Sequence, residues 1–417
     1  MEHNRTRGEG LPAFEVSYVV DLAAIDALLS PEGRSLLVEL AENPPALNDE
    51  IAVITRLRKT HSPALVAAAV EQAALRVRAR AKFSKASEMF FTRAGLEQAS
   101  SERMATHHAE RYGEFSHVAD LCCGVGGDLI GLASGREVVA VDVDRIHSRL
   151  SKMNADVYGV GASVIPVCAD VHDLPLDGIQ AVFVDPARRT ANRRFGPGMS
   201  EPSIAWCSSL AERGIAVGVK AAPGLPDDLV PPNWEAEFVS EHRELKECAL
   251  WSPRLATVQR RATLLPGGET LTGARPASVP VAPPGRFLID PDPAVTRAGL
   301  VQHLAEALGP VWRIDEQVAF LSSDTPIETA FGRTLEIAAS QPWSLARLKQ
   351  MLRDLDVGTV DIRKRGSAVD VDEIQRRLKL TGRRAATVVL TRVANRQWTM
   401  VCFAPDASGL DLNSTSV

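Results

Sequence analysis

The stretch Val118-Ala119-Asp120-Leu121-Cys122-Cys123-Gly124-Val125-Gly126-Gly127-Asp128 decides the fold class of this chain. An apolar run ends in the acid Asp120, a turn with three glycines follows, and Leu129–Ala133 has the pattern of a helix start. Glycines in such a unit let the backbone approach a nucleotide-like ligand closely. A dinucleotide fingerprint requires a third glycine where Leu129 stands. The remaining pattern, Asp-x-x-x-Gly-x-Gly-Gly, favours a ligand with a cationic amino acid moiety over a pyrophosphate. The alternative is an ordinary strand-to-helix turn of another α/β fold.

Composition limits the class of protein. The 417 residues predict two or three domains, and the hydrophobic fraction of 45% and charged fraction of 24% are those of a globular protein. The formal net charge of -5 predicts that any nucleic-acid contact depends on a local basic patch. The six cysteines form no C-x-x-C pair, so we expect no metal site and reduced thiols in the cytoplasm. No apolar run reaches about 18 residues, and we expect no membrane span.

Apolar runs alternate with helical stretches from about Val118 to Leu265. This alternation predicts an α/β fold with a doubly wound, Rossmann-like, mostly parallel sheet and helices on both faces. The expected strands are Val118–Leu121, Val138–Val141, Val164–Cys168, Ala181–Val184, Ile215–Val219, Glu237–Ser240 and a stretch near 257–265.

Other segments flank this α/β domain, which we expect over residues 84–265. Residues 1–83 are expected to form a helical region, because Ser30-Pro31 and Ser62-Pro63 each place an N-cap residue before a proline. Residues 266–285 are expected to form a linker or long hairpin, 286–405 a small α+β domain, and 406–417 a flexible tail. The small α+β domain is expected to contain helices Ala294–Leu308 and Leu345–Leu355 and strands Thr359–Arg363, Ala386–Val393 and Thr399–Cys402.

Acids follow the next two expected strands. Asp142 ends a strand about 20 residues after the glycine turn, where an acid can accept hydrogen bonds from both hydroxyls of a ribose. Asp144 can cap the next helix, and the alternative is that both acids only cap. Asp170 follows the third strand and either accepts from the exocyclic amine of an adenine or caps a short helix.

The fourth strand ends in Asp185-Pro186, at the sheet edge where ligands bind in such folds. A carboxylate and a nearby carbonyl at this place can accept hydrogen bonds from an amine and orient its lone pair, so positioning would dominate catalysis. Arg188 and Arg189 begin a basic loop that suits a phosphate-bearing substrate. The alternative is a solvated loop whose arginines pair with local acids. Lys220, at the end of a later strand, is a weaker candidate for shaping the substrate pocket.

These motifs together resemble a known family. Phe90-Phe91-Thr92, the glycine turn, Ala140–Asp144, Asn154–Gly159 and, more weakly, Asp185-Pro186 are similar to motifs of class I S-adenosylmethionine (SAM) methyltransferases, in particular the trimethylguanosine synthases, or RNA cap guanine-N2 methyltransferases. In that family a tryptophan after a Pro-Pro pair stacks on the methylated guanine. This chain has Ala187 and Arg188 after Pro186, so a cap is not the expected substrate.

The resemblance implies SAM as the cofactor and a role for each matching residue. Asp120 with Gly124, Gly126 and Gly127 would hold the methionine end, Asp142 the ribose and Asp170 the adenine. Asp185 with Pro186 would bind the acceptor amine. Thr92, with Phe91, would close over the cofactor, and Asn154–Gly159 would have a packing role. The sulfonium of SAM makes its methyl group electrophilic, so no metal is needed.

The C-terminal unit resembles the THUMP-like domain that follows bacterial methyltransferases of this group. Its signature is Asp361–Gly366, which contains Arg363, Lys364 and Arg365, followed by Arg376–Leu380 and Gly382–Ala385. Between residues 361 and 392, nine Lys/Arg face four acids, a local charge of +5. This basic segment is the kind of patch that RNA binding needs, and its lack of aromatic residues favours backbone or shape recognition. The alternative is a solvated face of an α+β domain.

The sequence therefore predicts a SAM-dependent methyltransferase that transfers a methyl group to a base nitrogen of RNA, of which a guanine exocyclic amine is one example. Arg188, Arg189, Arg363, Lys364 and Arg365 are the candidate RNA contacts. One alternative is a methyltransferase for a protein or small molecule. Another is a SAM-binding module without activity, which the altered Asp-Pro-Ala-Arg motif favours.

Overall fold

The computed structural model describes residues 21–43, 50–187, 189–190, 193–194, 199–273 and 279–405, with only the backbone for 50, 189–190 and 193–194. The expected flexible tail, residues 406–417, lies outside these ranges. The chain divides into two compact units, Met1–Val182 and Phe183–Val417, which are taken in turn. None of the described helices has the length and apolar character to cross a membrane.

The first unit begins with the expected helical region. Its helices are α1 (Leu22–Leu29), α2 (Pro31–Glu42), α3 (Glu50–Leu57) and α4 (Pro63–Ala79), followed by α5 (Arg93–Gln98) and α6 (Glu102–Glu110). Ser30 and Ser62 cap α2 and α4 as expected, because each side chain accepts a hydrogen bond from the amide three residues later. The helices therefore begin where the Ser-Pro pairs predict.

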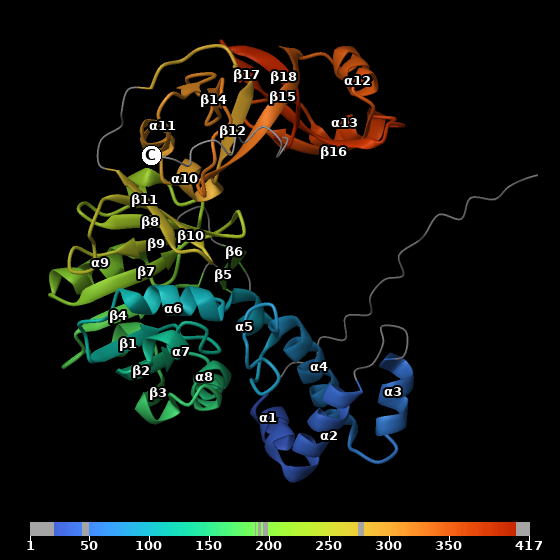
Figure 1. The fold of residues 1–417 in the computed structure, drawn as a ribbon. Helices are drawn as coiled ribbons and strands as arrows, with labels where there is room; N and C mark the ends of the chain where they lie inside the picture. The colour runs from blue at the N-terminus through green and yellow to red at the C-terminus, as the bar shows by residue number, and fades with distance from the viewer. Residues whose placement is uncertain are drawn as a thin grey trace, which may run out of the picture. The chain divides into compact units, whose positions relative to one another are not determined.

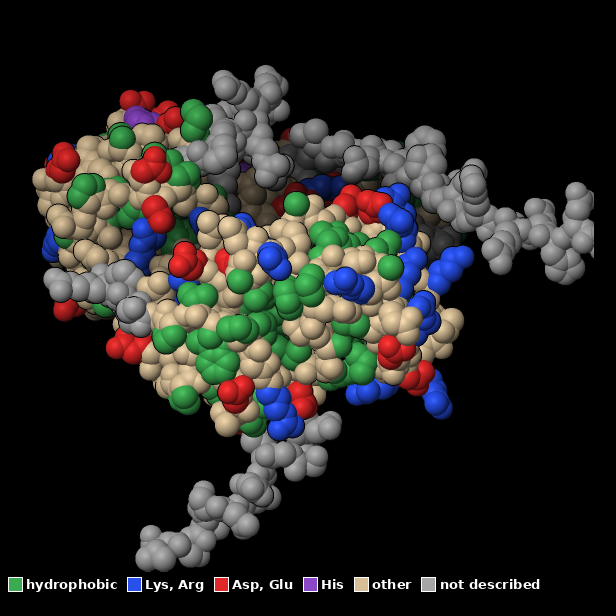
Figure 2. Space-filling model, turned by 90° about the horizontal axis from the view of Figure 1, so that it is seen from above, with side chains coloured by type: hydrophobic (Ala, Val, Ile, Leu, Met, Phe, Trp, Pro, Cys, Tyr) green, Lys and Arg blue, Asp and Glu red, His purple; other side chains and the backbone are tan. Residues whose placement is uncertain are grey.

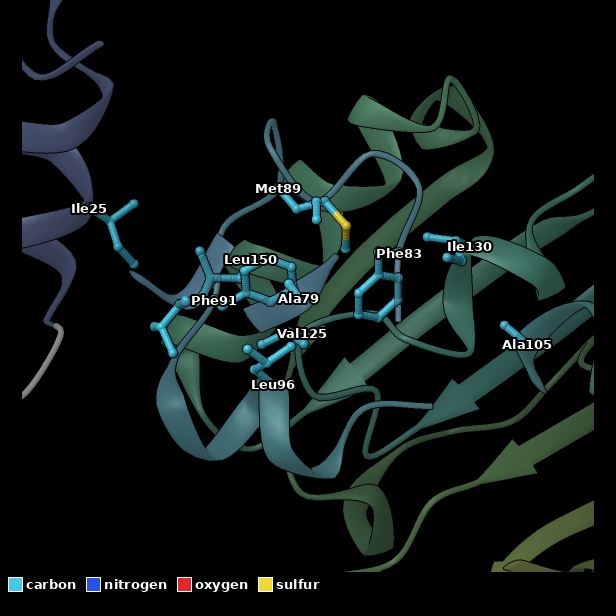
Figure 3. Close-up of a cluster of buried hydrophobic side chains, with 12 residues drawn as sticks. Ile25, Ala79, Phe83, Met89, Phe91, Leu96, Ala105, Val125, Ile130 and Leu150 are labelled. Carbon is cyan, nitrogen blue, oxygen red and sulfur yellow. The ribbon is translucent and has the colours of Figure 1, made fainter. Parts of the chain in front are cut away.

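A hydrophobic core joins this helical region to the α/β part of the same unit (Figure 3). Phe83, Met89 and Phe91 are fully buried and pack against residues that follow residue 121 in the sequence. Their partners include Val125 of the glycine turn and Leu150 of α8. At roughly 1.5–3 kcal/mol for each fully buried large apolar side chain, this cluster is a major contribution to the stability of the unit.

The α/β part of the first unit contains parallel strands β1 (His117–Leu121), β2 (Glu137–Asp142) and β3 (Val164–Cys168), in that spatial order. Short helix α7 (Leu129–Leu132) follows the glycine turn, and α8 (Arg145–Val157) packs against β2 and β3. Two 3-10 turns, Gly161–Ser163 and Val171–Asp173, flank β3. Because the strands are parallel, Asp120 near the end of β1 and Asp142 at the end of β2 come at the same edge.

Strand β4 (Ala181–Val184) spans the boundary, and the second unit continues the α/β pattern. Its elements are β5 (Arg189–Thr190), β6 (Arg193–Arg194), α9 (Ile204–Glu212), β7 (Ala216–Ala221), a 3-10 turn (Asp227–Leu229), β8 (Glu235–Glu241), β9 (Glu244–Trp251), β10 (Arg260–Leu265) and β11 (Glu269–Gly273). Strands β7 to β11 lie in the order β7-β9-β8-β10-β11, with β8 and β10 parallel and the other pairs antiparallel. The α/β class with a large, mostly parallel sheet is confirmed.

The C-terminal part of the second unit is a mixed seven-stranded sheet with helices, as the described residues show (Figure 1, orange to red). Its spatial order is β13-β14-β12-β15-β18-β17-β16, so β16 is an edge strand. The elements are β12 (Phe287–Pro291), α10 (Pro293–Arg297), α11 (Val301–Leu308), β13 (Trp312–Arg313), β14 (Leu321–Ser323), β15 (Gly332–Pro342), α12 (Leu345–Asp354), β16 (Val357–Lys364), α13 (Val371–Arg377), β17 (Arg384–Val393) and β18 (Arg396–Phe403). The separate α+β part is confirmed.

Candidate active site

The glycine turn after β1 has an unusual backbone that its sequence allows. Gly124 and Gly126 have φ values of 54° and 87°, and Cys122 also has a positive φ of 64°. The amide of Cys123 donates to the carbonyl of Val141 at 3.0 Å, which ties the turn to β2. A left-handed backbone favours glycine, so two of the three glycines are required by conformation alone.

The three glycines differ in what surrounds them. A Cβ on Gly124 would meet no described atom within 4 Å. A Cβ on Gly126 would lie 3.1 Å from the Cα of Ser151 in α8, and one on Gly127 would lie 3.0 Å from the amide nitrogen of Ser100. Gly126 and Gly127 therefore let the turn pack against neighbouring backbone, whereas Gly124 is the glycine with open space beside it.

Asp142, the last residue of β2, fixes the turn with its carboxylate. Its Oδ2 accepts from the amide of Gly124 at 2.9 Å, and its Oδ1 accepts from the amide of Asp144 at 2.9 Å. A carboxylate has about four acceptor positions, so these bonds leave capacity for two more donors. Asp144 itself caps α8 by accepting from the amide of Ile146 at 2.7 Å. Asp142 therefore holds the glycine turn, whereas the side chain of Asp144 serves as a helix cap.

The edge of the sheet at this turn carries a concentration of negative charge. Asp120 is buried at the end of β1. Burial, and after it the carboxylates of Asp120 and Asp142, raise the pKa of the Cys123 thiol well above its ordinary value. Two carboxylates that both act on one buried thiol create a negative potential there, which would favour a cationic ligand group.

Thr92 and His147 form a second layer beside Asp142. The Oγ1 of Thr92 caps α5 by accepting from the amide of Gly95 at 2.9 Å and lies 3.1 Å from Nε2 of His147. The Nδ1 of His147 lies 3.9 Å from Oδ1 of Asp142. Sequence reasoning missed His147, although its place in the first turn of the helix after Asp142 was a usable signal. Phe91 is buried in the core cluster and holds this segment in place.

Asn154 connects the Phe90–Thr92 segment to the glycine turn. Its Oδ1 accepts from the amide of Phe90 at 2.8 Å, and its Nδ2 donates to the carbonyls of Phe90 and Val125 at 2.9 and 2.8 Å. The side chain is fully buried. The expected packing role of this motif is therefore specific: one amide positions two loops. Gly159, with a φ of 79°, follows the end of α8.

Asp170 follows β3 and is exposed. Its Oδ1 accepts from the amide of His172 at 2.9 Å and lies 2.7 Å from Nδ1 of the same residue. Hydrogen bonds from the backbone and side chain of His172 lower the pKa of Asp170. The residue therefore caps a 3-10 turn as an ionised acid, and its role toward an adenine stays a prediction.

In the second unit, Asp185 directly follows β4 and pairs with a lysine. Its Oδ2 lies 2.8 Å from Nζ of Lys220 in β7, and the two side chains are 25% and 9% exposed. Pro186 is buried, and the backbone of Ala187 forms an antiparallel bridge with Glu201. Lys220, a weaker candidate from sequence, thus contacts the proposed acceptor acid directly, and its largely buried ammonium can hold that carboxylate in one orientation.

The candidate RNA-binding arginines have varied surroundings. Arg188 and the side chain of Arg189 lie outside the described residues, although the backbone of Arg189 pairs with Arg194. In the C-terminal sheet, Arg363 pairs with Asp361 at 2.9 Å, and Lys364 donates to the carbonyl of Val369 at 3.2 Å. Arg365 binds Asp290 at 2.7 Å and also donates to Thr296 and Pro291, so it organises the fold.

Comparison with known proteins decides the family. An uncharacterized SAM-dependent methyltransferase of Mycobacterium tuberculosis, found in two strains, is 34% identical over 339 residues, which cover 78% of this chain and 92% of that protein. The chain belongs to the SAM-dependent methyltransferases. SAM is accordingly the cofactor of this methyltransferase, as expected from the glycine turn.

Three family models match shorter regions of this methyltransferase. Residues 115–201 match the RNA cap guanine-N2 methyltransferase family, 332–404 match the THUMP domain-like family, and 21–79 match a domain of unknown function. The crystal structure of a proposed methyltransferase from Porphyromonas gingivalis has the same fold, with a TM-score of 0.70 at 22% identity over 86% of this chain and 98% of that one. The resemblance seen in the sequence motifs is confirmed.

Proposed function

We propose that this SAM-dependent methyltransferase acts on RNA and transfers the methyl group to a base nitrogen, of which a guanine exocyclic amine is one example. The observation that carries the proposal is the match of residues 115–201 to the RNA cap guanine-N2 methyltransferases, because this range contains the glycine turn, Asp142, Asp170 and Asp185. The match of residues 332–404 to a THUMP-like domain and the local charge of +5 support RNA as the substrate.

We assign the cofactor contacts to the first unit. Asp142 would accept from the ribose hydroxyls with the acceptor capacity that its two backbone bonds leave. Asp120 would attract the cationic end of the methionine, and the backbone at Gly124 would approach the ligand, while Gly126 and Gly127 keep the turn packed. Thr92 would help to position Asp142 through its contact with His147. Asp170 would accept a hydrogen bond from the adenine amine.

We assign the acceptor contacts to Asp185 and Pro186. The bound sulfonium supplies an electrophilic methyl group, so the protein has to position the nucleophilic nitrogen rather than activate the donor. The carboxylate of Asp185 and the carbonyl of Pro186 would accept hydrogen bonds from the amine and direct its lone pair. Lys220, at 2.8 Å, would hold the Asp185 side chain in one rotamer. The basic loop that begins with Arg188 and Arg189 would contact a phosphate of the substrate.

The division of labour follows the expected domains: residues 84–265 would carry the chemistry and 286–405 would bind RNA, with 1–83 as a helical region and 266–285 and 406–417 as connecting and terminal segments. The cysteines of the described residues are thiols and not disulfides, which supports the expected cytoplasmic location. Reduced thiols are the rule in that compartment.

The test is mass spectrometry of nucleosides from total RNA of a strain that lacks the gene. One methylated nucleoside should disappear and return with the parent gene or with the Asp177→Asn variant, which changes an exposed acid shortly before β4. It should not return with Asp185→Ala, although that variant should still bind SAM in calorimetry. Unchanged nucleosides, together with turnover of a protein or small molecule, would refute RNA as the substrate. SAM binding without any turnover would favour a binding module.

A further inference from the structure

A cavity of about 440 Å³ lies in the C-terminal part of the second unit. One wall is the corner between β12 and α10, which contributes Asp290, Thr296 and Arg297. The opposite wall is the end of β16, which contributes Arg363, Lys364 and Arg365. Four cationic side chains thus face one acid, so the lining has an excess of three positive charges.

Two of these cations are fixed by the fold. Arg365 binds Asp290 at 2.7 Å, donates to Thr296 Oγ1 at 2.8 Å, and lies over the ring of Phe320. Arg297 donates to the carbonyls of Pro223 and Leu225 at 2.9 and 3.1 Å. Side chains held in this way lose little conformational entropy when an anion binds nearby, which favours binding.

The other two cations can change partners at low cost. Arg363 and Asp361 form an ion pair in which both side chains are 52% exposed, and such exposed pairs contribute little to stability. Among the residues that the structure describes, Lys364 Nζ donates to the carbonyl of Val369, at the long distance of 3.2 Å. An anion with two or more acceptor oxygens could therefore accept hydrogen bonds from both Arg363 and Lys364 without breaking an interaction that the fold needs.

The cavity is connected to the proposed acceptor site within the same unit. Helix α10 packs against β8 and β10, and Asp292 before it accepts from Ser240 of β8 at 2.6 Å. The carbonyls that hold Arg297 follow the end of β7, which carries Lys220, the partner of Asp185. A ligand held in the cavity would thus be placed at a fixed position relative to Asp185.

The surroundings of the cavity favour a polymer over a small anion. Strand β16 is the edge of its sheet, and α13 and the loop before β17 add further cations. Figure 2 shows Lys and Arg side chains gathered along the side where Figure 1 places β16 and α13. A row of cations that continues beyond a cavity matches the repeating charge of a nucleic-acid backbone.

We propose that the cavity between α10 and the end of β16 binds a phosphodiester of the RNA substrate and thereby positions the strand. The proposal rests on the proposed function, since it takes RNA as the substrate. Arg363 and Lys364 would bind the phosphate directly, and Arg297 and Arg365 would form the fixed positive wall.

The experiment measures binding of a short, fluorescently labelled single-stranded RNA to the full-length protein as a function of salt. The double variant Arg363→Ala/Lys364→Ala should bind about tenfold more weakly and should lower the slope of log K against log salt by about 0.7, the value for one lost phosphate contact on a single strand. The control Arg347→Ala/Arg353→Ala removes two positive charges from α12, a helix of the same C-terminal part, and should bind like the parent. SAM affinity should be the same in all three proteins, which verifies the fold.

The outcomes separate the two levels of the proposal. If the parent methylates total RNA and the cavity variant binds RNA with the parent's affinity and slope, the cavity proposal is overturned and the function stands. Equal losses in both double variants would also overturn it, because the cavity would then have no special role. If the parent neither binds nor methylates RNA, the proposed function fails first. Binding to phosphatidylglycerol vesicles in place of RNA, lost in the cavity variant, would assign the cavity to a membrane surface.

Discussion

Replacing Asp142 by asparagine tests the centre of the proposed cofactor site. In the parent, the two carboxylate oxygens accept from the amides of Gly124 and Asp144, each at 2.9 Å. An asparagine offers one oxygen and one NH2 group, so one backbone amide would face a donor and lose its acceptor. An unsatisfied buried amide costs about 1–3 kcal/mol. The glycine turn should therefore shift or lose order.

The effect on SAM follows from two losses. Hydrogen bonds to a charged acceptor contribute about 1.5–3 kcal/mol, and the ribose would lose that charge. Distortion of the turn adds to this loss. Since each 1.4 kcal/mol corresponds to about tenfold in affinity, we expect Asp142→Asn to raise the Kd for SAM by between tenfold and about a hundredfold.

Isothermal titration calorimetry with SAM measures this change directly, and thermal unfolding without the cofactor reports the part that comes from the turn. Asp144→Asn is the matched control. The side chain of Asp144 accepts from the amide of Ile146 in the described structure, and asparagine caps helices as well as aspartate does. Its Kd should stay within about twofold of the parent value. If Asp142→Asn binds SAM as tightly as this control, Asp142 does not hold the ribose and the site assignment is wrong.

Four further predictions concern other parts of the molecule. Asn154→Leu removes three buried hydrogen bonds at about 1 kcal/mol each, so urea unfolding should show a loss of about 3 kcal/mol, and an unchanged midpoint would contradict the positioning role. Lys220→Met should lower turnover on RNA by about tenfold or more without changing the Kd for SAM, because it removes the ammonium that holds the carboxylate of Asp185 at 2.8 Å. The exposed Lys246→Met is its control, and a parental rate would remove Lys220 from the acceptor site. Burial raises the pKa of Cys207, Cys248 and Cys402 to about 12, so mass spectrometry should find them unmodified by iodoacetamide at about pH 8 while exposed Cys168 reacts. The same thiols ionise near 9.0 when unfolded, so stability should fall as the pH rises from about 9 towards 12, and a flat profile would contradict their burial.

The sequence predicts those elements whose signal is local. Strands β3 and β4 begin and end at the expected residues, because each is a short apolar run between polar turns. Strand β9 escapes such reading, since Glu244-Leu245-Lys246-Glu247 is charged and only its second half is buried. The expected helix Ala294–Leu308 is interrupted at Gly299, whose φ of 73° is incompatible with a helix. A single glycine in an amphipathic pattern does not reveal which way the backbone turns.

The site shows the same limit. Asp142 could be predicted because an acid at the end of the second strand has a fixed geometric relation to the glycine turn. The pair Asp185–Lys220 joins residues 35 apart, and Asn154 binds Phe90 from 64 residues away. Contacts of this kind depend on how elements pack, which neither spacing nor periodicity encodes. The engagement of Arg365 with Asp290 could not be seen for the same reason.

The core cluster that contains Phe83, Phe91, Val125 and Leu150 has a consequence for dissecting the protein. The regions matched by family models, 21–79 and 115–201, each contain part of this cluster, and Phe83 and Phe91 lie between the two regions. A shortened chain that starts after the helical region would expose Val125, which belongs to the glycine turn itself, and would remove Ile25, Leu75 and Ala79 from its surroundings.

The helical region is therefore an integral part of the first unit. Its loss should abolish SAM binding and cause aggregation, because a large apolar face would be exposed to water. Conversely, SAM should protect amides of residues 90–95 from hydrogen exchange, since Asn154 ties that segment to the turn. We therefore expect that the smallest piece of this chain that holds its cofactor begins near Leu22, because Ile25 of α1 belongs to the same cluster as Val125.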